Sequence, residues 1–213
     1  MKLLLTAFTP FGGEVLNPAL EAVKLVKDKI SGIDIVKLEV PTVFGKSVET
    51  VLKAMENERP DYVLCVGQAG GREGITPERI AINIDDARIA DNEGNQPIDE
   101  IIFKDGENAY FSNLPVKAMV YAIKSEGLPT GLSNSAGTYV CNHLMYGVLY
   151  YIDKKFKETK GGFIHVPYIP AQTKDKPEKP SLPLCDIVTG LEASITAIAE
   201  NEKDIRVTGG SEC

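Results

Sequence analysis

The chain of 213 residues has no tryptophan, only two histidines, and four cysteines that are far apart. The cysteines are Cys65, Cys141, Cys185 and Cys213. None of them has C-x-x-C spacing, so neither a disulfide framework nor a zinc site is indicated, and a reducing compartment is expected. With His143 and His165 as its only imidazoles, the chain also lacks the histidine clusters of transition-metal sites.

Basic residues are fewer than acidic ones, 23 against 30, which gives a formal net charge of −7. This balance argues against nucleic-acid binding, which normally needs a basic face to replace counterions. No apolar run approaches the ~20 residues of a membrane helix. The apolar start at residues 3–7 is too short for a signal peptide and ends at the turn-forming residues 9–13. We therefore expect a first strand there, and a cytoplasmic protein that does not bind a membrane.

Short apolar runs alternate with helical patterns along the chain, which predicts a single α/β domain over residues 1–213 with a mostly parallel sheet flanked by helices. Strands are expected at residues 3–7, 36–40, 62–66, 132–135 and 162–166. Helices are expected at residues 18–30, 48–55, 116–123, 139–151 and 184–198. Residues 85–113 are less regular, and we expect residues 80–89 to pair with residues 101–103 across a turn at 91–94.

Three chemically useful side chains follow predicted strands. Cys141 comes after the strand at 132–135, in the first turn of a helix, and His165 lies at the end of the strand at 162–166. Glu78 follows the glycine-rich segment after the strand at 62–66. Ligands of open α/β sheets bind beyond the carboxyl ends of the strands. The sequence therefore predicts that a thiol, an imidazole and a carboxylate converge there, as nucleophilic acyl transfer requires.

Cys141 is the expected nucleophile, because a helix N-terminus lowers the pKa of a thiol and offers N–H groups to an oxyanion. A buried cysteine is more often an inert core residue, and Cys65, within an apolar strand, fits that description. His143 is two residues beyond Cys141, and side chains at that spacing on a helix do not face each other. His165 is therefore the expected base, although a histidine in a strand is more often structural.

Glu78 is the expected carboxylate that orients His165, as the third member of a triad does. Taken alone, it would more often be a solvated carboxylate or an ion-pair partner of Arg79. The glycine-rich residues 67–74 lack both the G-K-[ST] of a P-loop and the G-x-G-x-x-G of a dinucleotide site. Close backbone packing near a site explains these glycines better than a phosphate cradle.

Each of the three side chains also lies in a longer recognisable segment. Glu78 lies in ITPERIAIN (75–83), which follows GQAG (67–70), Cys141 lies in SNSAGTYVCN (133–142), and His165 lies in GFIHVPY (162–168). Together with FTPFGG (8–13) and DARI (86–89), these segments resemble the pyroglutamyl-peptidase I (pyrrolidone-carboxylate peptidase) family of cysteine peptidases. The resemblance runs from about residue 3 to residue 170. Two positions depart from the family pattern: Ala90 replaces a proline, and Tyr139 replaces a common phenylalanine.

The resemblance implies a three-layer α/β/α sandwich with Cys141 as nucleophile, His165 as general base and acid, and Glu78 as the orienting carboxylate. It implies removal of N-terminal pyroglutamyl residues from peptides by a cytoplasmic homotetramer that uses no metal or cofactor. By matched position, Arg88 would lie near the oxyanion. By the same matching, the substrate pocket would be lined by Phe8, Phe11, Thr42, Gln68, Tyr139 and Val140.

Two other functions remain open from the sequence. The chain could be another α/β hydrolase or transferase that uses Cys141 on a different acyl group. It could also be a small-ligand binding module that keeps the pocket but does not turn over its ligand.

Overall fold

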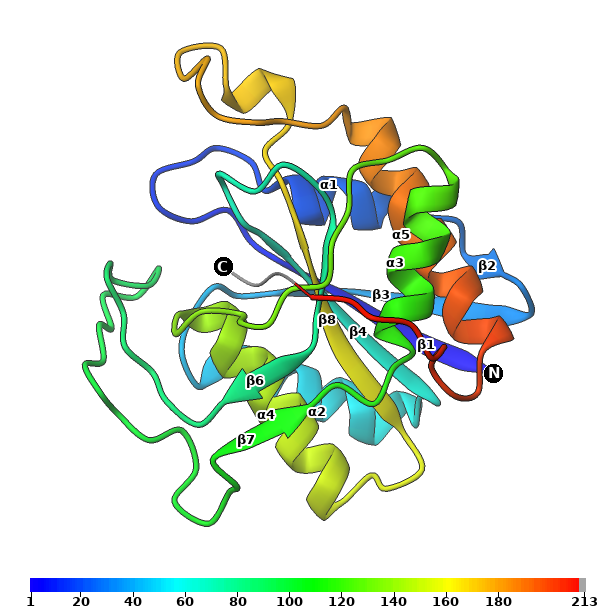
Figure 1. The fold of residues 1–213 in the computed structure, drawn as a ribbon. Coiled ribbons are helices and arrows are strands. Elements are labelled where there is room, and N and C mark those ends of the chain that lie inside the picture. The colour runs from blue at the N-terminus through cyan, green and yellow to red at the C-terminus, as the bar shows by residue number, and fades with distance from the viewer. Residues whose placement is uncertain (211–213) are drawn as a thin grey trace.

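The computed structural model describes residues 1–210, so Cys213 lies outside the described residues. A six-stranded sheet in the order β2-β3-β1-β4-β8-β5 forms the centre of the molecule (Figure 1). Its parallel strands are β1 (Lys2–Phe8), β3 (Ile33–Val40), β4 (Tyr62–Gln68) and β8 (Lys160–Val166). Its two edges, β2 (Lys29–Ile30) and β5 (Thr76–Glu78), are short and antiparallel to their neighbours.

Helices cover both faces of this sheet, which makes three layers (Figure 1). One face carries α1 (Pro18–Leu25), α3 (Val116–Ser125) and α5 (Leu184–Glu200). The other carries α2 (Lys46–Glu58) and α4 (Val140–Lys154). A short 3₁₀ helix, η1 (Pro170–Gln172), precedes α5. The predicted α/β fold with a mostly parallel sheet is therefore confirmed, and no helix within residues 1–210 has the length and apolarity to cross a bilayer.

The central strands read as continuous apolar runs because both of their faces are buried. In β4, Leu64 and Val66 pack toward the α1/α3/α5 layer, whereas Val63 and Cys65 pack toward α2 and α4. In β8, Phe163 likewise faces α4. Since side chains alternate along a strand, Gly67 and His165, which are paired in the register, also face α4. The α4 side is therefore the side on which the carboxyl ends of the strands can form a site.

The structure differs from the prediction at the end of one helix and at one predicted strand. The first helix ends at Leu25 instead of reaching residue 30, and β2 pairs with β3 through Ile30 and Ile33. The two intervening residues, Ser31 and Gly32, both have positive φ (46° and 83°), as a tight hairpin of this hand requires. Residues 132–135 form no strand: they contribute only a single bridge, between Ser133 and Glu78.

The irregular segment forms a hairpin with a different partner from the one predicted. β6 (Ile80–Ile82) pairs with β7 (Ala109–Phe111) in a separate two-stranded sheet. Residues 101–103 form no strand, and the Phe103 ring instead stacks on Tyr150 of α4 with ring centroids 4.2 Å apart. Residues 83–108 are long coil tethered at a few points, such as the bridge between Asp85 and Glu100.

Candidate active site

Cys141 lies in the first turn of α4, directly over the end of β4. Its side chain is half-buried, and a methyl group added at Gly67 would lie 3.0 Å from its Sγ. Only a residue without Cβ allows this approach of the thiol to the strand. Because Gly67 is the register neighbour of His165 on β8, the thiol and the imidazole lie on the same face of the sheet, at adjacent strand ends.

His165 and Glu78 are joined by a buried hydrogen bond. The antiparallel pairing of β5 with β8 aligns Glu78 with Phe163 and Thr76 with His165, so Glu78 and His165 are diagonal neighbours on one face. His165 Nδ1 lies 2.7 Å from Glu78 Oε1, and both side chains are almost completely buried. Hence two of the residues predicted from separate segments, His165 and Glu78, are in direct contact, and Cys141 lies on the same side of the sheet.

Arg72 is a member of this cluster that the sequence did not reveal. Its Nη1 donates to Glu78 Oε1 at 2.6 Å and also to Thr76 Oγ1, while Nη2 donates to the Ser135 carbonyl at 3.1 Å. The arginine considered from the sequence, Arg79, instead donates to the carbonyl of Gly209. A guanidinium therefore touches the same carboxylate oxygen as His165.

The charges of the cluster follow from burial and these contacts. Burial of Glu78 favours its neutral form and so raises its pKa. The hydrogen bond with His165 and the positive charge of Arg72 have the larger combined effect and hold the pKa of Glu78 below the usual range. Burial lowers the pKa of His165 despite the neighbouring carboxylate. The resting cluster thus contains an ionised Glu78 and a neutral His165, whose Nδ1–H donates to the carboxylate. Nε2 is then the unprotonated nitrogen.

The pKa of Cys141 is raised, although its position at a helix N-terminus favours a low pKa. Burial raises this pKa to about 12, the Glu78 carboxylate adds to the increase, and Arg72 opposes it. In the resting site, the sulfur therefore carries its proton. A partner that accepts this proton during the reaction is needed, and the neutral imidazole is suited to that role.

The predicted pocket residues divide into two groups. Phe11 and Tyr139 lie together near the thiol segment with ring centroids 6.0 Å apart, and Phe44, not predicted, meets Tyr139 edge-on at 5.5 Å. Phe8 and Val140, by contrast, are fully buried in the core on the α4 side. The first group can line a pocket, and the second supports it from behind.

The polar side chains predicted for the pocket differ in whether they are free to bind a ligand. The Thr42 hydroxyl donates to the Thr9 carbonyl at 2.8 Å, and Gln68 Oε1 accepts from Gln172 Nε2 at 3.0 Å. Arg88 is exposed, and its side chain makes no hydrogen bond or ion pair with the residues at 1–210. The Arg88 guanidinium is therefore free to meet a ligand, whereas Thr42 and Gln68 already have partners.

The two departures from the family pattern contact each other. The Tyr139 hydroxyl donates to the Ala90 carbonyl at 3.1 Å. The oxygen that distinguishes tyrosine from phenylalanine is therefore used to hold the loop around residue 90. It adds little polarity to the aromatic surface formed with Phe11.

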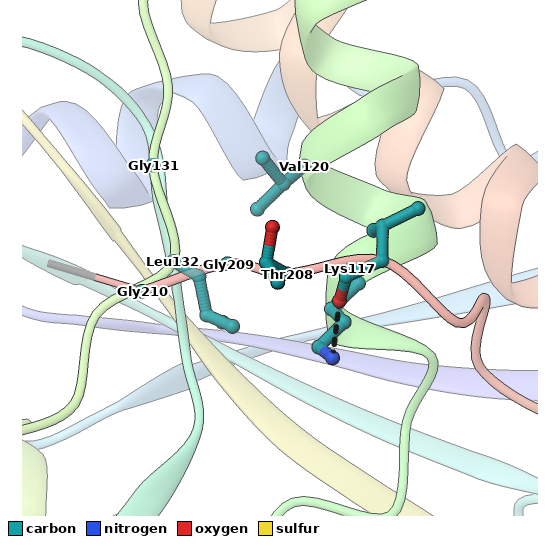
Figure 2. Close-up of a pocket in the computed structure, with 8 residues that line it drawn as sticks. Lys117, Val120, Gly131, Leu132, Thr208, Gly209 and Gly210 are labelled. Atoms are coloured by element: carbon teal, nitrogen blue, oxygen red, sulfur yellow. Dashed lines mark hydrogen bonds between the residues drawn. The ribbon is translucent and has the colours of Figure 1, made fainter.

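No group of three or more His, Cys, Asp or Glu side chains in the described part of the chain is arranged to hold a metal ion. A cavity of about 310 Å³ lies away from the cluster, between α3 and the 207–210 segment (Figure 2). There Lys117 Nζ donates to the Val207 carbonyl, so the one charged side chain that lines the cavity has a partner. This cavity contains none of the predicted site residues.

Comparisons with known proteins place this geometry in a family. A family model described as Pyroglutamyl peptidase matches residues 1–201. The chain is 60% identical to the pyrrolidone-carboxylate peptidase of Clostridium perfringens (strain 13 / Type A) over 213 residues, which cover both chains completely.

Solved structures agree with this relationship. The pyroglutamyl peptidase I of Bacillus amyloliquefaciens superposes with a TM-score of 0.95 at 50% identity, covering 97% of this chain and 99% of that one. A mutant (E192I) pyrrolidone carboxyl peptidase of the hyperthermophile Pyrococcus furiosus gives 0.90 at 41% identity, covering 94% and 99%. The fold, the motifs and the full-length similarity agree: the chain belongs to the pyroglutamyl peptidase family of cysteine peptidases.

Proposed function

We propose that this protein is a cysteine exopeptidase that hydrolyses the peptide bond after an N-terminal pyroglutamyl (5-oxoproline) residue, with Cys141, His165 and Glu78 as its catalytic triad. The observation that carries the proposal is the buried 2.7 Å bond between His165 and Glu78 beside the thiol segment at the strand ends. The full-length similarity to pyrrolidone-carboxylate peptidases supports the substrate class.

The proposed reaction begins with a neutral thiol and a neutral imidazole. As Cys141 Sγ attacks the scissile carbonyl carbon, its proton passes to Nε2 of His165, and the Glu78 carboxylate stabilises the imidazolium that forms. N–H groups at the start of α4 are the expected donors to the tetrahedral oxyanion, and Arg88 is expected nearby. His165 then protonates the leaving amine, which departs and leaves a thioester on Cys141.

Hydrolysis of the thioester completes the cycle. His165, neutral again, takes a proton from a water molecule as its oxygen attacks the thioester carbon. Collapse of this second intermediate breaks the C–S bond, and the thiolate recovers a proton from the imidazolium. The products are free pyroglutamate and the shortened peptide. Every proton is moved by His165, so no metal or cofactor is required.

The proposed pocket suits a lactam. Pyroglutamate has no free amine, so it needs no carboxylate anchor, and the nearby Glu78 is already engaged by His165 and Arg72. The ring offers flat apolar faces, one N–H and one C=O. The aromatic pair Phe11 and Tyr139 matches the faces. Backbone groups or the Gln68 amide nitrogen can pair with the polar atoms, because Gln172 engages only the amide oxygen of Gln68. Polar groups left unpaired by a proline ring would disfavour that substrate.

We further propose that the protein works as a single-domain subunit of a cytoplasmic homotetramer. Large apolar side chains are exposed in the irregular 85–113 segment, and contiguous exposed apolar surface commonly marks an interface. They are Ile89, Ile98, Ile101 and Phe111. This segment and the helix that follows Cys141 are our candidates for the subunit contacts.

Release of a fluorophore from pyroglutamyl-aminocoumarin, beside its prolyl and alanyl analogues, tests the activity. We expect the wild type to cleave only the pyroglutamyl compound, and Cys141→Ser to lose at least about 10³-fold in kcat/KM. Cys185→Ser is the matched control, because Cys185 is exposed and lies at the start of another helix.

Three results would contradict the proposal. Cleavage of all three substrates would indicate a broader acyl hydrolase. An equal loss in Cys185→Ser would remove the assignment of the nucleophile. A folded and reduced wild type that cleaves none of the substrates would point to a binding module, and titration with pyroglutamate itself would then be the next measurement.

A further inference from the structure

His143, rejected above as the catalytic base, is buried with a partner on each ring nitrogen. Its Nδ1 lies 2.7 Å from Asp85 Oδ2, and its Nε2 accepts the N–H of Gly45 at 2.9 Å. A backbone N–H can only donate, so Nε2 carries the lone pair and Nδ1 carries the proton that Asp85 accepts. These two partners assign a neutral imidazole with one defined tautomer.

This imidazole connects three segments that surround the proposed pocket. His143 itself belongs to α4, two residues after Cys141. Gly45 ends the loop that contains Thr42 and Phe44, and it is the N-cap of α2 with a φ of 71°. Asp85 belongs to the long coil that continues to Asp91. One ring thus fixes the spacing between the thiol helix and two loops.

The Phe44 ring, which packs against His143, connects this imidazole to the aromatic side chains of the proposed pocket. Phe44 meets His143 edge-on at 5.4 Å and Tyr139 edge-on at 5.5 Å, and Tyr139 in turn packs on Phe11. The backbone N–H of Phe44 donates to Asp91 Oδ2 at 2.9 Å. Phe44 is therefore held at three points. Its backbone N–H donates to Asp91, its ring packs against the His143 ring, and the N–H of the next residue, Gly45, donates to His143.

We propose that His143 is a positioning residue of the substrate pocket: by accepting the Gly45 N–H and donating to Asp85, it sets the position of Phe44 and, through it, the aromatic surface of Tyr139 and Phe11. The inference rests on the function proposed above. His143 touches none of the reacting atoms, so its loss should weaken substrate binding and leave the acyl-transfer steps in place. The expected signature is a change in KM with little change in kcat.

Two amide variants separate the two bonds of the ring. In His143→Gln, the amide oxygen can reach the Nε2 position and accept the Gly45 N–H. In His143→Asn, the shorter amide can donate to Asp85 but cannot reach Gly45. We expect His143→Asn to raise KM for pyroglutamyl-aminocoumarin about tenfold, the equivalent of one lost hydrogen bond, with kcat within about twofold of wild type. His143→Gln should recover most of this loss.

Two further variants serve as controls. Tyr150→Phe removes another tertiary hydrogen bond of α4, the one donated to Asp105, which lies beyond the 85–91 part of the coil, and it should leave KM unchanged. Asp85→Asn keeps an acceptor for Nδ1–H, so its KM should rise less than that of His143→Asn. It also provides the comparison if thermal melting shows that His143→Asn does not fold.

The outcomes separate this inference from the proposed function. An inactive wild type would reject the function and the inference with it. An active wild type whose His143→Asn variant keeps the wild-type KM, or loses kcat at constant KM, would overturn the inference alone. Equal KM values for the Asn and Gln variants would also overturn it, because the Gly45 bond would then have no role. If His143→Asn does not fold, Asp85→Asn becomes the test: a raised KM at constant kcat supports the inference, and a KM equal to that of the wild type overturns it.

Discussion

The Arg72 guanidinium places a permanent positive charge in direct hydrogen-bond contact with Glu78 of the proposed triad. It shares Glu78 Oε1 with His165, so one oxygen accepts from both a guanidinium and an imidazole. The Arg72 charge helps to keep Glu78 ionised and disfavours the protonated form of His165. The availability of a neutral base in this buried site therefore depends partly on an arginine that does not touch the thiol.

Replacement of this arginine should change the pH profile in a defined direction. Arg72→Met removes a charge that lowers the pKa of His165, so that pKa rises. The base form exists above this pKa, and the acidic limb of kcat/KM should therefore move to higher pH. At neutral pH we also expect kcat/KM to fall by up to about 10²-fold as Glu78 loses a positioning partner. Rates of pyroglutamyl-aminocoumarin cleavage across pH 5–8 measure both effects.

The matched control for this experiment is Arg206→Met, which removes an exposed arginine of the C-terminal segment. Its profile should coincide with that of the wild type. An acidic limb that stays in place in Arg72→Met would show that the guanidinium does not influence the protonation of His165.

The sequence predicts Cys141, His165 and Glu78 as a site because each lies at or after the end of a segment with the pattern of a strand. It could not identify Arg72, because two arginines are near Glu78 and spacing alone favours Arg79. Adjacent residues of an extended segment point to opposite faces, so the Arg79 side chain cannot contact the Glu78 carboxylate. Arg72 reaches the carboxylate only because the chain turns at residues 69–72, where the Arg72 N–H donates to the Ala69 carbonyl. The pKa of Cys141 was mispredicted because burial is a property of the folded site.

At the scale of elements, α3 begins with a cap that comes from the other end of the chain. Its N-cap residue is Pro115, which provides no capping side chain. The carboxylate of Asp204 instead accepts the N–H groups of Lys117 and Ala118 at 2.9–3.1 Å. A negative charge at this position also complements the helix dipole. The segment that follows α5 is thereby attached to α3.

Removal of this cap should reduce stability. We expect Asp204→Ala to lower the free energy of unfolding by about 1–2 kcal/mol, as the loss of a helix N-cap usually does. Asp204→Asn keeps an acceptor oxygen and should lose less. Urea denaturation provides the measurement, with Glu158→Ala as a control for an exposed acidic residue that makes no ion pair within residues 1–210. Equal stability of the Asp204→Ala and Glu158→Ala variants would contradict the capping role.

Most helices and all four central strands were predictable, because their apolar periodicity extends over enough residues to be read. The two edge strands of the central sheet, β5 and β2, were not predictable in this way. β5 has only three residues, and its middle residue is Pro77, which has no N–H to donate and is tolerated at a sheet edge. β2 has two residues and depends on the Ser31-Gly32 turn. Pairing of such short strands is decided by the neighbouring strand, and no local pattern records it.

For the whole molecule, the exposed apolar side chains of the 85–113 segment raise the question of assembly. Ile98, Ile101 and Phe111 are each more than 60% exposed. The coil between β6 and β7, to which Ile98 and Ile101 belong, extends away from the three-layer body (Figure 1). Where exposed apolar groups form one contiguous patch, they commonly mark an interface, which motivates a test of assembly.

Light scattering at micromolar concentration should give the mass of a tetramer of 23.1 kDa chains. The double substitution of Ile98→Asp with Ile101→Asp should lower that mass, since charges would be buried without partners in the contact. Val15→Asp is the control, because Val15 is 92% exposed but lies outside the segment. A monomeric wild type would reject the assembly, and an unchanged mass in the double variant would reject this segment as its contact.

The two histidines of this chain have a practical value for spectroscopy. Both are buried, and each donates an Nδ1–H to a carboxylate oxygen 2.7 Å away. Protons in short bonds of this kind resonate far downfield of the amide region in a one-dimensional proton NMR spectrum. Since the chain has no other imidazole, only two such signals have to be assigned. One proton belongs to the proposed catalytic triad and the other to the imidazole beside Phe44, so a single unlabelled sample can show which of the two signals shifts when a ligand is added.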